Sequence, residues 1–286
     1  MYMDRLSVER WITEHFAGHS GNVVTAEMAA EHPQVAGLVM YDAPLMGVAA
    51  ADDPLFERYK SWDVIAPFHM TPCEWLPGAK SVISLFFPLS QRVRASNRGA
   101  IDETSYEWLY ARIEGQAFIA AFCAELAQWL KSCGARVCVP AADPRFGVAR
   151  GGEGPLASYP GAPKDLFASN WSERHAAFAA GLGTFSLTRG LITKRGMAGR
   201  FGSVIVDLPL EVSPRPYREP YEYCIRCGAC ARRCPAGAIS LERGKEQAPC
   251  KAYLGRQKQL YAPRYGCGKC QTAVPCEAGI PIAPRA

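Results

Sequence analysis

Residues 224–235 read Cys224-Ile-Arg-Cys227-Gly-Ala-Cys230-Ala-Arg-Arg-Cys234-Pro235, and this stretch decides how the C-terminal part of the chain folds. The spacing C-x2-C-x2-C-x3-C-P is typical of proteins that bind cubane iron–sulfur clusters, because short loops let three thiolates converge on one cluster. The fourth cysteine lies too far along the chain, and Pro235 directs it towards a second cluster. A structural zinc site would explain two or three of these cysteines, but hardly four at this spacing.

A second group of cysteines completes the set of ligands. Cys250 is followed by Cys267-Gly-Lys-Cys270 and by Cys276, so the last quarter of the chain holds eight cysteines, enough for two four-iron clusters. The exchanged pattern of two-cluster ferredoxins suggests which cysteines share a cluster. One cluster would be held by Cys224, Cys227, Cys230 and Cys276, and the other by Cys234, Cys250, Cys267 and Cys270.

Length and composition predict a globular protein with one large and one small domain, since 49% of its 286 residues are hydrophobic and 21% are charged. The chain has no run of about 18 apolar residues and no signal-peptide core, so we expect a cytoplasmic protein with no membrane span. Twelve cysteines in a reducing compartment fit metal binding better than disulfides. The late basic residues form either a solvated surface or a docking face for an acidic electron donor or an RNA backbone.

Hydrophobic periodicity predicts an α/β domain ahead of the cysteines. A buried strand, a long helix and another strand form a crossover unit. A proline-rich linker places the domain boundary near residue 215, which gives domains 1–215 and 216–286. The expected helices are 3–16, 105–131 and 171–182, the expected strands are 36–40, 81–87, 136–140 and 203–208, and the expected loops are 42–54 and 147–164.

The densest group of chemically useful side chains lies in Ser169-Asn-Trp-Ser-Glu-Arg-His175. Glu173, Arg174 and His175 near a helix start could bind and protonate a substrate. The alternative is a capped helix with surface charges, since Ser172 suits the cap and glutamate suits the first turn.

The chain resembles the epoxyqueuosine reductases and the related corrinoid-dependent reductive dehalogenases from about residue 75 onward. The resemblance rests on residues in a fixed order along the chain. These are Glu173-Arg174, Ala-Gly-Leu-Gly183, Gly202-Ser203, Asp207-Leu-Pro-Leu210, the run from Cys224 to Cys234 with Pro-x-Gly-Ala-Ile239, Cys250-x2-Tyr253, and Tyr265-Gly-Cys267-x2-Cys270-Gln271.

This resemblance implies a cobalamin-binding α/β domain followed by a ferredoxin-like domain with two [4Fe-4S] clusters. By analogy, the residues that line the cofactor would be Gly181, Gly183, Gly202 and Ser203. The aspartate that donates a proton in the reductases is replaced here by Phe167, and Asp165 lies two residues away as the remaining acidic candidate. The lysine that follows the Gly-Leu-Gly segment in the reductases is also absent. These differences weigh against a tRNA substrate.

Three hypotheses about function arise from these patterns. The first is a cytoplasmic oxidoreductase that passes electrons through two clusters to a cobalamin or a substrate in the α/β domain, supplied by a low-potential donor such as a ferredoxin or flavodoxin. The second is an electron-transfer or docking protein without a substrate of its own. The third is epoxyqueuosine reduction in tRNA.

Overall fold

A four-stranded sheet forms the centre of the computed structural model, which describes residues 3–282. The strand order is β1-β2-β8-β3, and every neighbouring pair is antiparallel. The bounds are β1 (Leu45–Ala50), β2 (Ser81–Pro88), β8 (Gly199–Val206) and β3 (Val137–Cys138). All eight residues of β2 are buried, which confirms the prediction that residues 81–87 form a strand covered on both faces.

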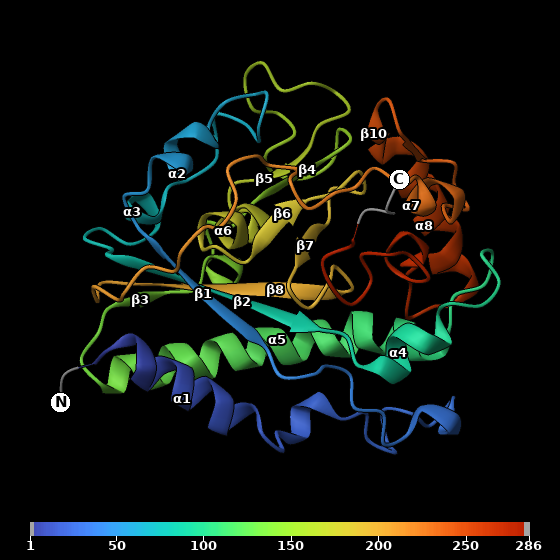
Figure 1. The fold of residues 1–286 in the computed structure, drawn as a ribbon, viewed down its shortest axis with the longest axis horizontal. Helices are drawn as coiled ribbons and strands as arrows, with labels where there is room; N and C mark the ends of the chain where they lie inside the picture. Colours follow the sequence, from blue (N-terminus) through green and yellow to red (C-terminus); the bar gives the residue numbers. More distant parts are fainter. Residues whose placement is uncertain (1–2, 283–286) are drawn as a thin grey trace.

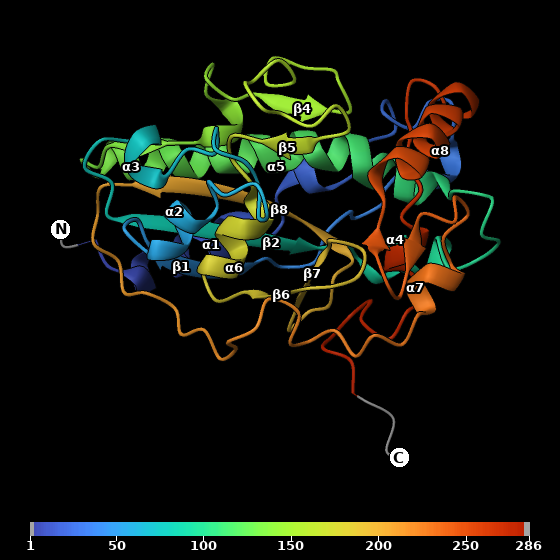
Figure 2. The same cartoon turned by 90° about the horizontal axis from the view of Figure 1, so that it is seen from above.

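Helices cover both faces of this sheet (Figures 1 and 2). The long helix α5 (Tyr106–Ser132) lies along one face with α1 (Arg5–Phe16) beyond it, and α6 (Glu173–Ala179) packs on the other face. The predicted long helix is confirmed with its cap, because the Ser105 hydroxyl accepts a hydrogen bond from the Trp108 amide at 3.3 Å. Shorter helices are α2 (Pro54–Arg58), α3 (Pro72–Trp75) and α4 (Gln91–Ser96).

The crossover connection predicted from the sequence is present, but a strand from later in the chain lies between the two strands that it connects. Strands β2 and β3 are both antiparallel to β8, so they run in the same direction, and α5 connects them. Strand β8 fills the space between them. The α/β class is therefore correct, although no neighbouring strands of this sheet are parallel.

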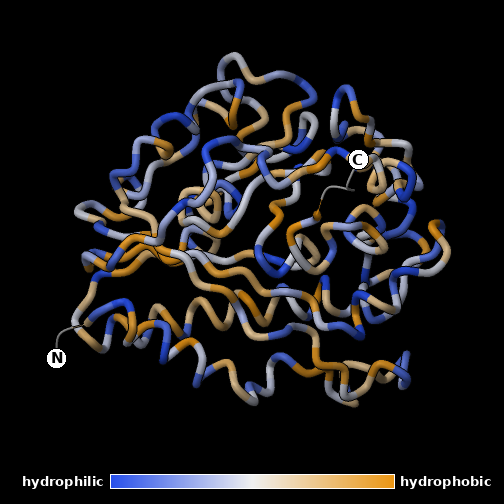
Figure 3. The backbone as a smooth tube through the Cα atoms, viewed as in Figure 1, coloured by the Kyte–Doolittle hydropathy of each residue, from blue (hydrophilic) through white to orange (hydrophobic). Residues whose placement is uncertain are grey.

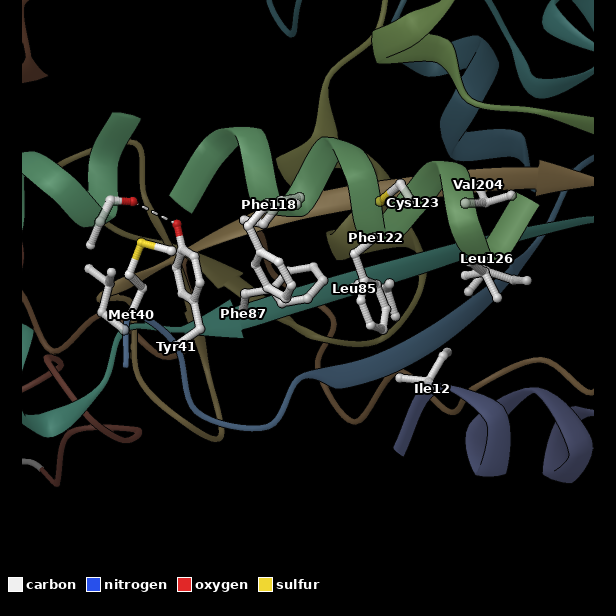
Figure 4. Close-up of a cluster of buried hydrophobic side chains, with 14 of the residues drawn as sticks. Ile12, Met40, Tyr41, Leu85, Phe87, Phe118, Phe122, Cys123, Leu126 and Val204 are labelled. Carbon is white, nitrogen blue, oxygen red and sulfur yellow. Dashed lines mark hydrogen bonds between the residues drawn. The ribbon is translucent and has the colours of Figure 1, made fainter. Parts of the chain in front are cut away.

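Most of the hydrophobic core lies between the sheet and α5 (Figure 4). Phe118 and Phe122 of α5 pack against Phe87 of β2, and apolar stretches concentrate along the central strands (Figure 3). The buried Tyr41 hydroxyl is satisfied, because it donates a hydrogen bond to the Ala111 carbonyl at 2.9 Å (Figure 4). A second cluster of buried side chains lies on the α6 face and includes Trp75 and Trp171.

Two expectations for the N-terminal part are wrong. Residues 45–50, expected within a loop, form β1, and residues 36–40, expected as a strand, take part only in an isolated bridge between Val23 and Val39. The small residues of β1 reflect close packing, because a Cβ added at Gly47 would overlap the Ala180 carbonyl at the end of α6.

The remaining elements are short, apart from one helix. The strand pairs are β4 (Val148–Arg150) with β5 (Phe167–Ser169), β6 (Gly183–Phe185) with β7 (Leu191–Thr193), and β9 (Ile239–Ser240) with β10 (Gly244–Lys245). Strand β4 lies inside the stretch 147–164 that was expected to be all loop. The helices are α7 (Ala229–Arg232), α8 (Gln247–Leu260) and the 3-10 turns η1 (Ser20–Asn22), η2 (Pro33–Val35), η3 (Pro140–Ala142) and η4 (Lys269–Gln271).

The proline-rich segment after β8 is packed along the α/β domain and is not a free spacer. The Ser213 amide donates to the Val48 carbonyl of β1 at 2.9 Å, and the Tyr217 hydroxyl donates to the Phe178 carbonyl at 2.7 Å. The cysteine-rich part is also held to the domain, since the Asn97 side chain donates to the Cys267 carbonyl at 2.8 Å. The boundary near residue 215 stays a prediction. None of the helices within residues 3–282 is both long and apolar enough to cross a bilayer.

Candidate functional site: two cysteine cavities

Two similar turns present cysteines in the C-terminal part. Each turn has the sequence Cys-Gly-x-Cys, with Gly228 at φ 71° and Gly268 at φ 68°. Glycine adopts this left-handed conformation without strain, so the chain can reverse directly after one cysteine and bring the next one round. Helix α7 begins after Gly228 and η4 begins after Gly268.

The first turn opens on a cavity of about 20 Å³, which we call the apolar cavity. Its walls are mainly apolar side chains from the β6–β7 hairpin and the C-terminal part, among them Leu187, Ile192 and Val274. Burial and the neighbouring thiols raise the pKa of Cys230 to about 11, whereas Cys227 is exposed. Four cysteines line this cavity: Cys224, Cys227, Cys230 and Cys276.

The second turn opens on a larger cavity of about 160 Å³, which we call the arginine cavity. It lies between the cysteine-rich part and the α5, α6 and β8 elements of the α/β domain. The Ala238 amide donates to the Cys234 Sγ atom at 3.3 Å, and burial raises the pKa of Cys270 to about 12. Four cysteines line this cavity as well: Cys234, Cys250, Cys267 and Cys270.

The structure thus brings together the same two sets of four cysteines that the ferredoxin pattern suggests. Helix α7 lies between them, because Cys230 lines the apolar cavity and Cys234, just beyond the helix, lines the arginine cavity. Four convergent thiols suit an iron–sulfur cluster, and all eight cysteines are free. Buried thiols with raised pKa values are costly to ionise alone, and a bound iron supplies the positive charge that stabilises the thiolates.

Three arginines line the arginine cavity together with the cysteines. Arg112 comes from α5, Arg174 from the first turn of α6 and Arg200 from the start of β8. Arg174 is exposed and lines the cavity, whereas Arg112 and Arg200 are half-buried. Burial lowers the pKa of Arg200 to about 10, and the positive charges of Arg112 and Arg174 add to this effect. Sequence reasoning found only Arg174, since the others are lone cations in apolar stretches.

Glu173 and His175 do not line the arginine cavity. Burial raises the pKa of Glu173 to about 7, and neither carboxylate oxygen has a hydrogen-bond partner within the described residues. Burial lowers the pKa of His175 to about 3, and its Nδ1 atom lies 2.8 Å from the Ser172 hydroxyl. Asp165 is exposed in the loop before β5. Of the four predicted catalytic residues, only Arg174 faces a cavity lined by cysteines.

The residues predicted to line a cofactor are instead in contact with the chain itself. A Cβ at Gly181 would overlap the Pro214 carbonyl, and one at Gly183 would overlap the Ile192 carbonyl. At Gly202 it would lie 2.7 Å from the Cys123 Sγ atom, and the Ser203 hydroxyl accepts a hydrogen bond from the Trp171 indole at 2.9 Å. None of the four lines either cysteine cavity.

A separate group, His15, His19 and Glu125, has metal-type ligand atoms within 4.8 Å of one another. The Gly21 amide donates to His19 Nδ1 at 3.0 Å, so the neutral ring carries its proton on Nε2. That nitrogen donates to Glu125 at 3.0 Å and has no lone pair left for a metal. The group is therefore a hydrogen-bonded triad linking α1 and α5.

The fold and the cysteine sites define an iron–sulfur protein with an α/β domain and a ferredoxin-like region. The 4Fe-4S binding domain family matches residues 220–240. The epoxyqueuosine reductase of Yersinia pestis is 32% identical over 115 residues, a stretch that spans 36% of this chain and 27% of that protein. These matches confirm the sequence resemblance to epoxyqueuosine reductases over part of the chain.

A solved reductive dehalogenase structure shows the same fold. A catabolic reductive dehalogenase in complex with 3-bromo-4-hydroxybenzoic acid aligns with a TM-score of 0.50 and 17% identity, over 83% of this chain and 30% of that one. An epoxyqueuosine reductase with an epoxyqueuosine-modified tRNA stem loop aligns with a TM-score of 0.48 and 20% identity, over 85% of this chain and 64% of that one.

The corrinoid that the family resemblance implies is a poor match to these cavities. Pockets that enclose drug-sized ligands measure roughly 300–1,000 Å³, and a corrin ring with its side chains is larger than such ligands. The arginine cavity, at about 160 Å³, is too small to enclose one. The glycines expected to line the corrinoid lie against other parts of the chain, namely backbone carbonyls at Gly181 and Gly183 and the Cys123 side chain at Gly202. We therefore place no corrinoid in either cysteine cavity.

Proposed function

We propose that this chain is an iron–sulfur oxidoreductase that passes electrons through two [4Fe-4S] clusters to a small acceptor in the arginine cavity. The observation that carries the proposal is the grouping of the eight cysteines, four around each cavity, with three arginines lining the second cavity and only the exposed Arg226 at the first. Clusters so held would accept and pass on single electrons. Helix α7 would separate them by about one helical turn.

The surroundings of the two sites suggest the direction of transfer. Cys227 is exposed at the apolar cavity, so a low-potential donor such as a ferredoxin or flavodoxin can approach the first cluster there. The exposed Arg226, just before this turn, and Arg232, at the end of α7, would attract an acidic donor. The second cluster lies against the α/β domain, where Arg174 would hold the acceptor. We place this activity in the cytoplasm, where thiols remain reduced.

A tRNA substrate is the second candidate, and the partial identity to an epoxyqueuosine reductase favours it. The arginines could then receive a phosphate of the RNA backbone. Turnover of epoxyqueuosine in a modified tRNA would establish this activity. Normal reduction of both clusters without turnover of any substrate would instead indicate an electron-transfer protein.

The experiment that tests the proposal is anaerobic purification followed by iron, sulfide and cobalt analysis, with cobalamin added to part of the reconstituted protein. We expect about eight irons per chain and no stoichiometric uptake of cobalamin. About four irons after full reconstitution would refute the second cluster. Stoichiometric uptake of cobalamin would refute the small acceptor and make this a corrinoid enzyme.

A further inference from the structure

The three arginines of the arginine cavity have no acidic partner within residues 3–282. Arg112 stacks over the Tyr265 ring, 4.4 Å from its centroid, and its buried Nε atom has no hydrogen-bond partner there. Arg200 and Arg174 form no ion pair with any described carboxylate either. Arg112 and Arg200 are half-buried, and a guanidinium group withdrawn from water without a partner is costly, so three unpaired arginines lining one space call for an explanation.

Other arginines of the chain show that this arrangement is not general. Arg264, also beside α5, pairs with Glu114 at 2.7 Å and stacks on Tyr110. The mostly buried Arg94 lies 3.7 Å from the buried Glu277. The chain thus supplies carboxylates to partly buried arginines elsewhere and supplies none to the three in the cavity.

A cluster alone does not balance this charge. Lys245 lines the same cavity, which makes four cationic side chains. A [4Fe-4S] cluster with four thiolates carries a net charge of about −2 when oxidised. The other titratable neighbours are phenols, Tyr265 beside Arg112 and Tyr41 beside Arg200. About two positive charges therefore remain without a partner.

The arginine cavity brings the guanidinium groups and four cysteines around one space of about 160 Å³, so an anion held by the arginines would lie next to the cluster. Guanidinium groups bind the oxygens of such groups through paired, parallel hydrogen bonds.

We infer that the arginine cavity binds an oxyanion, a phosphate or carboxylate group of the acceptor, through Arg112, Arg174 and Arg200. The inference deepens the proposed function and rests on it, because the anion would lie beside the cluster that delivers the electrons. It also defines the class of acceptor as an anionic small molecule or an anionic portion of a larger one.

Isothermal titration calorimetry of the anaerobic, cluster-reconstituted full chain tests this inference. The probes are inorganic phosphate and, separately, acetate, each at constant ionic strength set with sodium chloride. We expect saturable binding at one site per chain for at least one probe. Arg200→Gln should weaken it roughly tenfold or more, and the double variant R174Q/R200Q should abolish the measurable heat.

Two matched variants make the result specific. Arg200→Lys keeps the positive charge but loses the planar guanidinium group that donates paired hydrogen bonds. Anion binding should therefore weaken several-fold while the iron content stays unchanged. Arg10→Gln removes an exposed arginine of α1 with the same change in net charge, and binding should stay within about twofold of wild type. If Arg200→Gln fails to hold its clusters, the anion affinity of Arg200→Lys tests the inference instead.

The outcomes separate this inference from the proposed function. Full iron content without saturable heat from either probe would overturn the inference and leave the two-cluster proposal standing. Equal weakening in Arg10→Gln and Arg200→Gln would also overturn it, because only net charge would then matter. Low iron with phosphate binding that still depends on Arg200 would refute the proposed function alone.

Discussion

The two cysteine cavities begin with the same turn and differ in what the rest of the chain places against it. The apolar cavity has walls such as Leu187 and Val274 and includes the exposed Cys227. The arginine cavity faces α5, α6 and β8, which supply three arginines. Because hydrogen bonds, charge and burial set the potential of a cluster, identical ligands can serve different purposes. The cysteine motif fixes which ligands are available, and the α/β domain determines what each cluster can do.

Removing a cysteine from one cavity should have the largest effect. In Cys270→Ala we expect the iron content to fall from about eight to about four per chain, because the arginine cavity loses a ligand. Cys227→Ala should cause the same loss at the apolar cavity. Iron and sulfide analysis with electron paramagnetic resonance of the reduced protein will show which signal remains.

The matched control for this experiment is Cys73→Ala, which removes an exposed cysteine distant from both motifs in sequence. We expect it to retain all of the iron. If Cys270→Ala and Cys227→Ala lose the same signal, the four cysteines of each cavity do not form separate sites.

The two turn glycines provide the next test, because both have positive φ but only at Gly268 would an added Cβ overlap an aromatic ring. A Cβ at Gly268 would overlap the ring of Trp108 on α5, whereas at Gly228 the nearest atom is the mobile end of Arg232 at 3.2 Å. Gly228→Ala should cost about 1–2 kcal/mol from backbone strain. Gly268→Ala should cost about 1–3 kcal/mol more, because α5 and the turn must separate. Denaturant unfolding under anaerobic conditions measures both, and equal costs would contradict the observed packing of Trp108.

Trp108 also shows what the sequence could and could not predict. The cysteine spacing, the helical period of residues 105–131 and the apolar run 81–87 are local patterns, and each gave an element that the structure contains. The meeting of Trp108 with Gly268 joins positions 160 residues apart in the chain, and no local pattern encodes it.

The arginine cavity was missed for the same physical reason. Arg112, Arg174 and Arg200 lie on a helix, another helix and a strand, and only tertiary packing brings them to one space. The single available signal was a cation inside an otherwise apolar stretch, as at Arg112 between Ala111 and Ile113. Strand β1 was missed because small residues that permit close packing resemble those of a loop.

Glu173 lies beside Arg174 in α6 but away from the cavity, and it should make stability depend on pH. Its pKa is raised from 4.5 to about 7, so the folded protein binds more protons than the unfolded chain between these values. The contribution of Glu173 to stability is therefore highest below pH 4.5, falls as pH rises, and levels off above about pH 7. The total loss amounts to about 3 kcal/mol at most.

The variant Glu173→Gln removes this titration while keeping the shape of the side chain. We expect its advantage in melting temperature over wild type to grow from pH 5.5 to 7 and then to remain constant to pH 8.5. Asp165→Asn, at an exposed carboxylate, should show no such trend. An advantage of Glu173→Gln that is the same at every pH would mean that Glu173 does not titrate in this range.

The smallest effect should come from Arg226, an arginine at the apolar cavity. It is exposed and donates a hydrogen bond to the Leu241 carbonyl, so water already solvates most of its charge. Arg226→Gln should change the free energy of unfolding by less than about 1 kcal/mol and leave phosphate binding within about twofold of wild type. Arg200→Gln carries the same loss of charge, so calorimetry of the two variants side by side compares the cavities directly. A loss of phosphate binding in Arg226→Gln would place the anion at the apolar cavity. The apolar cavity, and not the arginine cavity, would then be the anion-binding site.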